Sequence, residues 1–530
     1  MKRKLISLLL LLTLLLTACG GEKGATVRVA LGGPVTALDP AFAETGASAS
    51  AILHVYDNLL RVTADGNGGT KLTGAAALSW ETVDNYDGTV TYVFTLSPDA
   101  VWSDGEPVTA EDFIYAWQRL VAEKTASPHA ELLAPLKGYD EAIEQKDPTA
   151  LAMEADEDGK LRVTLAWHCP YFLRSVCAAA PTVPLRQDVV ERYGEDWGSK
   201  RDAIVGNGSY TVSGWDTEGL TLTRRDGVPE TAPYTLSFLP ARTVAAAEQL
   251  LADGAADFIS PIGGESFLRV SAEADYTPVP IACAISVRFG SCGACTDAAL
   301  RRALFAATDY TAVTACFEGK PVTPAGGLVP DGILTSEGKD FRTENGIKTD
   351  VRDENRDYRE ETVRTAMREA ESAPESLSLI YPVENTELSR LATALASAWK
   401  EMTGLAVKVE PLTAEDFADA TEAGTFDCAL VETDTDIADA MSFLSWYGGT
   451  DGEDKPRVSE GYSTLVSIAM GALDERARDS YLFAAENELI SSCAAIPVAF
   501  RGVAYEKAPA LHNVAYDGVG NWLFHGAAFG

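Results

Sequence analysis

Residues 101–128 read VWSDGEPVTAEDFIYAWQRLVAEKTASP and contain the clearest secondary-structure signals of the chain. An Asp-Gly turn signal leads into Thr109-Ala-Glu-Asp112, which has the spacing of a capping box. In a capping box the threonine hydroxyl and the acidic side chain satisfy free backbone amides at a helix start. Bulky apolar residues follow at i, i+4 and i+7, namely Phe113, Trp117 and Leu120. The stretch therefore predicts a turn and an amphipathic helix with one buried face.

A second informative region alternates strand and helix patterns. Strands are expected at residues 377–381, 406–409 and 426–431. A helix that stops at Gly404 separates the first two, and a second capping box begins at Thr413. Strand–helix–strand order predicts parallel pairing with right-handed crossovers. Because ligands of such sheets bind beyond the carboxyl ends of the strands, residues 432–444 are a candidate binding segment.

Shorter elements are predicted elsewhere along the chain. Strands are expected at residues 26–31, 89–96, 161–165 and 219–224, and helices at residues 50–60, 244–251 and 297–307. Residues 331–360 are dense in charged and turn-forming residues, so we expect a long surface excursion there.

The N-terminus has the pattern of an export signal. Lys2 to Lys4 precede an apolar run from Leu5 to Leu16, which is too short to span a bilayer core of about 30 Å as a helix. The run ends in Leu-Thr-Ala-Cys19, which resembles a bacterial lipoprotein lipobox, in which the cysteine is acylated. We therefore expect residues 1–18 to be a lipoprotein signal peptide, Cys19 to carry a membrane anchor and residues 19–25 to be a tether. The alternative is a plain secretory signal with a chance cysteine.

The length and net charge of the chain restrict its domain organisation and its possible partners. A chain of 530 residues is long enough for two or three subdomains. The formal net charge of −35 repels nucleic acids and anionic lipid surfaces, so we expect no nucleic-acid partner. The excess of acidic residues is typical of a solvated surface, and attraction of cationic ligands is the alternative.

The reactive residues predict no enzyme and no cofactor. The nine cysteines are too few in so long a chain for a disulfide framework, and Cys292-Gly-Ala-Cys295 is either a local disulfide or a thiol pair before a helix. The five histidines are scattered without metal-ligand spacing, so no metal site is expected. A nucleophile elbow and a phosphate-binding loop are both absent from the sequence. An envelope hydrolase stays a remote alternative that would need a nucleophile.

Several further blocks occur in a fixed order. They are Leu38-Asp39-Pro40, Ala76-Ala-Leu-Ser-Trp80-Glu, Cys169-Pro-Tyr-Phe172, Val205-Gly-Asn207-Gly208-Ser-Tyr210, Leu300-Arg301-Arg302-Ala303-Leu304 and Thr425-Phe426-Asp427. Together with residues 101–128 they resemble the solute-binding proteins of ABC transporters for peptides, the oligopeptide/dipeptide-binding family (bacterial extracellular solute-binding protein family 5). The resemblance covers essentially the whole chain after the signal.

The resemblance implies an α/β, periplasmic-binding-protein-like fold of type II, with two lobes and an extra third subdomain on the first lobe. Its expected parts are residues 26–60, 181–290 and 501–530 for lobe I, residues 61–180 for the extra subdomain and residues 291–500 for lobe II. It also implies a monomer that captures peptides outside the cytoplasm by hinge closure and delivers them to an ABC permease.

Site residues carry over only where the sequence matches the family. Asp436 matches the aspartate that pairs with the ligand's α-ammonium, and Asp434 stands next to it in the acidic segment 432–444. The alternative for both is a solvent-exposed acid. Glu44 and His129 match positions near the ligand. Gly206 and Asn207 are either contacts or a turn that shapes the lobe.

Some family positions differ in this chain. Glu432-Thr433 stand where the family usually has Gly-Trp, and Ala414 stands where a tryptophan is common. The scaffold motifs are therefore present while several pocket aromatics are not. These differences leave open that the same scaffold binds a non-peptide solute (a metal chelate, an opine or a glycoside) or acts as a sensor.

Overall fold

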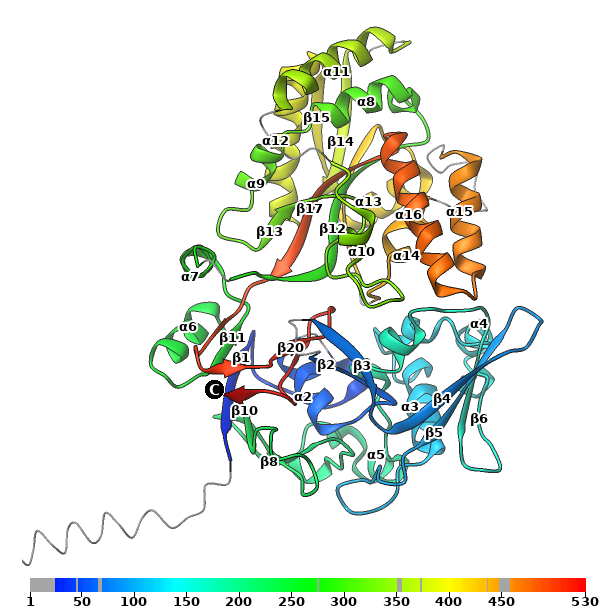
Figure 1. Ribbon diagram of the computed structural model, residues 1–530, viewed down its shortest axis with the longest axis vertical. Coiled ribbons are helices and arrows are strands. Elements are labelled where there is room, and N and C mark those ends of the chain that lie inside the picture. Colours follow the sequence, from blue (N-terminus) through cyan, green and yellow to red (C-terminus); the bar gives the residue numbers. More distant parts are fainter. Residues whose placement is uncertain are drawn as a thin grey trace, which may run out of the picture.

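The computed structural model describes residues 24–43, 46–64, 69–273, 276–349, 355–371, 374–435, 437–447 and 458–530. Figure 1 shows two lobes, one above the other, with a further subdomain beside the lower lobe. Each lobe contains a six-stranded mixed sheet, and the subdomain contains a four-stranded antiparallel sheet. In the described ranges, no helix has both the length and the hydropathy needed to cross a membrane.

The lower lobe, lobe I, is built around the sheet β18-β11-β1-β10-β9-β8. Its strands are β1 Thr26–Leu31, β8 Tyr210–Asp216, β9 Gly219–Arg224, β10 Thr235–Phe238, β11 Phe258–Ser260 and β18 Glu506–Lys507. Strand β1 pairs parallel with β10 and β11, and its side chains are buried from Val29 to Leu31. Helices α2 Ala47–Val55, α6 Val244–Ala252 and α7 Gly264–Val270 belong to this lobe.

The extra subdomain confirms the elements predicted from residues 101–128. Its sheet has the order β4-β5-β7-β6, with β4 Ala77–Asp84, β5 Val90–Leu96, β6 Met153–Ala155 and β7 Leu161–Leu165. Helix α3 Ala110–Val121 starts at the capping box, where the Thr109 amide donates to Asp112 Oδ2 over 2.9 Å. The predicted stripe of Phe113, Trp117 and Leu120 is at most 1% exposed. The other elements are the hairpin β2 Leu60–Ala64 and β3 Thr70–Gly74 and the helices α4 Tyr139–Glu144 and α5 Gln187–Tyr193.

The upper lobe, lobe II, is built around the sheet β13-β17-β12-β16-β14-β15. Its strands are β12 Val279–Phe289, β13 Val322–Pro324, β14 Ser376–Pro382, β15 Ala406–Leu412, β16 Cys428–Asp434 and β17 Ala495–Val503. Strand β14 pairs parallel with both β15 and β16, as predicted. The helices are α8 Ala298–Ala306, α9 Tyr310–Ala315, α10 Phe341–Asn345, α11 Arg356–Glu369, α12 Thr386–Thr403, α13 Ala414–Ala423, α14 Met441–Leu444, α15 Glu460–Gly471 and α16 Glu475–Ser491.

Two long strands connect the lobes. Figure 1 shows β12, in green, and β17, in red, running from the hinge region beside lobe I into lobe II. They pair antiparallel, with Val279 opposite Val503 at the end nearest lobe I. The chain then returns to lobe I through the short strands β19 Leu511–His512, β20 Ala515–Tyr516, β21 Trp522–Leu523 and β22 Ala528–Phe529. A pair of crossing strands of this kind allows the lobes to rotate about a hinge.

The structure corrects two expectations. The helix predicted at residues 50–60 is α2, which begins at Ala47 and ends at Val55, because Leu60 already enters strand β2. The described part of residues 331–360 does not form a surface excursion, since Ile333, Phe341 and Arg342 are at most 4% exposed. A buried ion pair between Arg342 and Glu486 of α16 holds this segment against lobe II.

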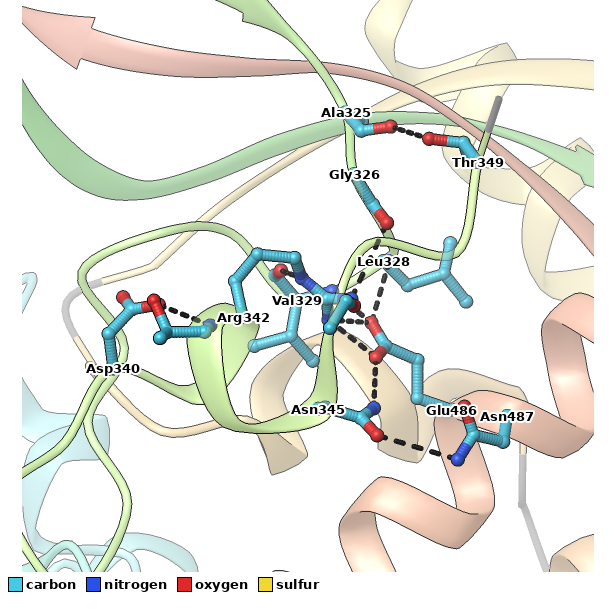
Figure 2. A network of polar contacts seen from close by, with 12 residues as sticks. Ala325, Gly326, Leu328, Val329, Asp340, Arg342, Asn345, Thr349, Glu486 and Asn487 are labelled. Atoms are coloured by element: carbon cyan, nitrogen blue, oxygen red, sulfur yellow. Dashed lines mark hydrogen bonds and ion pairs between the residues drawn. The ribbon is translucent and has the colours of Figure 1, made fainter. Parts of the chain in front are cut away.

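Figure 2 shows that the Glu486 carboxylate accepts several hydrogen bonds from this segment. Its Oε1 accepts the backbone amides of Leu328 (2.8 Å) and Val329 (2.9 Å), and its Oε2 accepts Asn345 Nδ2 over 2.6 Å. The Glu486 side chain has no exposed surface. Full hydrogen bonding is what makes a buried carboxylate tolerable, so this network fixes the segment in place.

A buried histidine in lobe I predicts a pH dependence of stability. His54 Nδ1 bonds Ser50 O over 2.6 Å, and its Nε2 accepts the Phe524 amide over 2.9 Å, which fixes a neutral ring with the proton on Nδ1. Burial lowers the pKa of His54 from 6.5 to about 4. The unfolded chain therefore binds a proton first, and we expect His54 to contribute a fall of about 3 kcal/mol in folding stability as the pH drops from 6.5 to 4.

Urea unfolding of the wild type and of His54→Gln across this pH range checks the prediction. The slope of the free energy of unfolding against pH should be smaller in His54→Gln than in the wild type. The control is His512→Gln at an exposed position, which should keep the wild-type slope. Equal slopes in all three proteins would show that His54 is not the responsible group.

Candidate functional site

The candidate site is a cavity of about 570 Å³ between the lobes. Lobe I lines it with the turn at Gly32-Gly33, the start of α2 at Ala47 and the C-terminal residues Tyr516 and Trp522. Lobe II lines it with Ala282 of β12 and with Asp434 and Thr435 at the end of β16. The cavity thus lies beyond the carboxyl end of a strand in the parallel part of the sheet, where the sequence predicts a ligand.

Two neighbouring cavities extend this site. One of about 410 Å³ shares Tyr516 and Trp522 with the first and reaches Pro280 and Leu334 of lobe II. Another of about 50 Å³ shares Val519 with the first and Arg174 with the second. The three cavities share lining residues and are here together called the interlobe cleft.

The acidic wall of the interlobe cleft is the end of β16. Asp434 is exposed on that wall and lies opposite Cys283 in the register of β12. The backbone of Thr435 continues the pairing, because its amide donates to Ala282 O over 3.2 Å. Asp436, Glu44 and Cys19 lie outside the described residues.

The loop after β16 is anchored by a residue that the sequence interpretation missed. Asp439 receives two hydrogen bonds from Arg478 of α16, at 2.7 and 3.0 Å, and both side chains are buried. Asp439 Oδ1 also accepts the Met441 amide over 2.8 Å and so starts α14. Asp439 is therefore a structural acid, and it fixes the downstream end of the segment that contains Asp434.

The altered family positions Glu432 and Thr433 have internal partners. Glu432 Oε2 accepts Arg501 Nη2 (3.1 Å) and Asn385 Nδ2 (2.9 Å), and Arg501 Nη1 donates to Glu387 Oε2 over 2.8 Å. Thr433 Oγ1 accepts Arg288 Nη2 over 2.8 Å. The two residues thus hold β16 against β12 and β17, and neither is among the lining residues of the interlobe cleft.

Cationic side chains line the opposite wall, to which lobe I and the extra subdomain both contribute. Arg174 lies where the two smaller cavities meet, and its Nη2 donates to Thr70 Oγ1 over 2.9 Å. Burial lowers the pKa of Arg174, partly offset by the Asp517 carboxylate nearby. Arg242 and Lys507 line the cleft at more open positions. No sequence motif singled out these residues, nor Tyr516 and Trp522.

Of the remaining predicted residues, His129 lines the interlobe cleft, whereas Gly206 and Asn207 do not. His129 lines the smallest cavity together with Ala438 of lobe II, and its amide donates to Ser127 Oγ over 3.1 Å. Asn207 instead forms two hydrogen bonds with the backbone of Asp57, at 2.8 and 3.0 Å. A Cβ at Gly206 would lie 2.2 Å from Val55 O, so this glycine is needed for close packing on α2. The structure does not bring Gly206 and Asn207 to the cleft.

Two α/β lobes, a pair of crossing strands and a cleft between the lobes define the class of two-lobed binding proteins of the periplasmic type. Residues 71–455 match the family described as "Bacterial extracellular solute-binding proteins, family 5 Middle", and the chain belongs to this family. It is therefore an extracytoplasmic solute-binding protein and not an enzyme.

Three relatives illustrate the similarity. The periplasmic oligopeptide-binding protein OppA of Escherichia coli K12 is 28% identical over 487 residues, which cover 88% of this chain and 85% of OppA. YgiS of the same strain, described as a probable deoxycholate-binding periplasmic protein, is 27% identical over 501 residues, covering 88% and 86%. Among solved structures, the unliganded open form of the murein tripeptide-binding protein MppA has a TM-score of 0.80 at 23% identity and covers 96% of this chain and 97% of that one.

Within the described residues, no group of three or more histidine, cysteine, aspartate or glutamate side chains is arranged to hold a metal ion.

Proposed function

We propose that this protein captures short peptides in the interlobe cleft and delivers them to an ABC permease for uptake. The observation that carries the proposal is the set of neighbouring cavities between the lobes, with Asp434 on the lobe II wall and Arg174 on the opposite wall. The named activity of OppA, oligopeptide binding, supports the same ligand class.

The charges of the cleft suit a zwitterionic chain. A free peptide carries an α-ammonium at one end and a carboxylate at the other, and each would meet the opposite sign at one wall. Charge-assisted hydrogen bonds of this kind are about twice as strong as neutral ones. The peptide backbone would add strand-like main-chain hydrogen bonds, which give affinity without reading the side chains. Asp436 and Asp434 are the proposed ammonium acceptors, with Glu44 and His129 close to the ligand.

The arrangement of the lobes is consistent with a state that awaits ligand. The TM-score to the unliganded open form of MppA is 0.80, whereas another structure of MppA from Escherichia coli gives 0.62 over the same 96% of this chain. Closure would rotate one lobe toward the other about β12 and β17, and the bound peptide would be enclosed.

The proposal includes the site of action. The lipobox-like sequence supports removal of residues 1–18 and acylation of Cys19, so that the protein acts as a monomer tethered to the outer face of the membrane. A single lipid chain binds membranes only weakly, so more than one acyl group would be needed for a stable anchor. The division into lobe I, the extra subdomain and lobe II is proposed with the bounds given from the sequence, except that β12 Val279–Phe289 pairs within the lobe II sheet and α5 Gln187–Tyr193 contacts α3 of the extra subdomain.

A non-peptide solute is the second candidate. Its support is the name of YgiS, a relative of similar identity described as deoxycholate-binding, and the replacement of the family's Gly-Trp by Glu432-Thr433. Such a ligand would gain little from an ammonium acceptor, and this difference separates the two candidates.

Replacement of Asp436 by alanine tests the proposed ammonium acceptor. We expect Asp436→Ala to weaken peptide binding at least about tenfold, because the ligand's ammonium would lose its carboxylate partner. Isothermal titration with the tightest peptide from a pool of short peptides gives the dissociation constant. The matched control is Asp419→Ala, at an exposed position of α13. Equal affinities of Asp436→Ala and Asp419→Ala would remove Asp436 from the site.

A further inference from the structure

Two buried cysteines meet in the core of lobe II. The Sγ atoms of Cys295 and Cys428 lie 3.7 Å apart, and the two residues are 1% and 0% exposed. They come from separate elements, since Cys428 is the first residue of β16 and Cys295 lies in the short turn before α8. Both thiols are free in the structure.

The surroundings of Cys295 leave space for its side chain to move. A small cavity of about 20 Å³ is lined by Cys295, Phe289 and Arg301, among others. Arg301 Nη1 donates to the backbone carbonyl of Cys295 over 3.0 Å, which holds the main chain in place. A disulfide requires the sulfur–sulfur distance to shorten from 3.7 Å to about 2.05 Å.

We propose that Cys295 and Cys428 form a disulfide in the exported protein. The family acts outside the cytoplasm, where disulfides form and persist. From the sequence, Cys292-Gly-Ala-Cys295 was either a local disulfide or a thiol pair; the structure brings Cys295 to Cys428, and Cys292 is exposed. The proposal is independent of the ligand and of the proposed peptide uptake.

The chemistry is thiol–disulfide exchange with a small disulfide such as oxidised glutathione, while the chain folds and both cysteines are still accessible. One cysteine thiolate attacks the small disulfide and releases one small thiol. The other cysteine then attacks the mixed disulfide and releases the second. Two protein thiols are oxidised to one disulfide, and one small disulfide is reduced to two thiols, so protons and electrons balance.

The disulfide would fasten β16 to the segment before α8. Strand β16 pairs with both β12 and β14 and ends at Asp434 on the wall of the interlobe cleft. The closed loop limits the freedom of the unfolded chain, so the oxidised protein should melt at a higher temperature than the reduced one.

The test uses the full chain exported by a bacterial host. Free thiols are blocked with a maleimide in denaturant at lysis, so that buried thiols also react, and the protein is digested without reductant for mass spectrometry. We expect a linked pair of peptides that contain Cys295 and Cys428, which persists in Cys292→Ser and in the control Cys316→Ser. Cys428→Ser should lose the linked pair, and its melting temperature should no longer change on reduction.

Two results would overturn the proposal. One is maleimide on both Cys295 and Cys428 of the exported wild type, also after refolding with oxidised glutathione. The other is a link between Cys292 and Cys295 that leaves Cys428 blocked by maleimide. Peptide binding is measured separately on the same samples, so that a failure of peptide capture and a failure of the disulfide proposal are distinguished.

Discussion

Replacement of Glu486 by alanine is expected to lower the free energy of unfolding by about 3–5 kcal/mol. The variant leaves the Arg342 guanidinium buried without its carboxylate. It also removes the acceptor of the Leu328 and Val329 amides and of Asn345 Nδ2. Removal of one partner from a buried ion pair lowers the free energy of unfolding by more than the intact pair adds to it, because the remaining charge stays desolvated without compensation.

Urea unfolding of Glu486→Ala and of Glu361→Ala measures this effect against a matched control. Glu361 makes an ion pair with Arg364 on α11, and both side chains are more than half exposed. Exposed pairs contribute about 0–1 kcal/mol, so the control should stay close to the wild type. Similar losses in the two variants would contradict the role given to the buried network.

Replacement of Arg478 by alanine is expected to have a similar effect on stability and a second effect on ligand binding. The variant leaves Asp439 buried without its two charge-assisted hydrogen bonds, at an expected cost of about 3–5 kcal/mol. It also loosens the loop that follows Asp434 on the wall of the interlobe cleft. We therefore expect weaker peptide binding, although Arg478 is not a lining residue.

The same helix offers the control. Arg476 is two residues away on α16, its side chain is 79% exposed, and it pairs with Glu337 at the surface. Arg476→Ala should lose less than about 1 kcal/mol and keep the wild-type affinity. If Arg478→Ala binds peptide as tightly as Arg476→Ala, the position of the loop does not depend on the ion pair.

Local signals predicted the secondary structure well. The capping boxes at Thr109 and Thr413 involve residues only three positions apart, so a short segment of sequence contains both partners of each hydrogen bond. The parallel pairing of β14 with β15 and β16 follows from the strand–helix–strand order, because a helix between two strands favours this connection.

Partners distant in the sequence were not predictable. Arg342 stands in a charged stretch typical of a surface loop, and its partner Glu486 lies 144 residues further along. Asp439 stands in an acidic stretch that is typical of a solvent-exposed loop, and its partner Arg478 lies 39 residues further along. A single sequence gives the charges but not the pairs, and burial depends on the pair.

The candidate site was predictable in part. The rule that ligands bind beyond parallel strands pointed to the segment after β16, and Asp434 indeed lines the interlobe cleft. The wall opposite lobe II was missed, because Arg174, Tyr516 and Trp522 reach it from segments without a binding motif. The roles of Asp436, Glu44 and His129 in binding stay predictions.

The most direct test of peptide capture is thermal unfolding of residues 20–530 with pools of short peptides, each supplied with free and with acetylated N-termini. Ligand at about 100 times its dissociation constant stabilises a protein by about 2.7 kcal/mol, which is a clear shift in melting temperature. We predict a shift with free N-termini and a much smaller one with acetylated N-termini, since acetylation removes the ammonium that the acidic wall would bind. The absence of a shift with every peptide pool would contradict peptide capture and direct the search to non-peptide solutes.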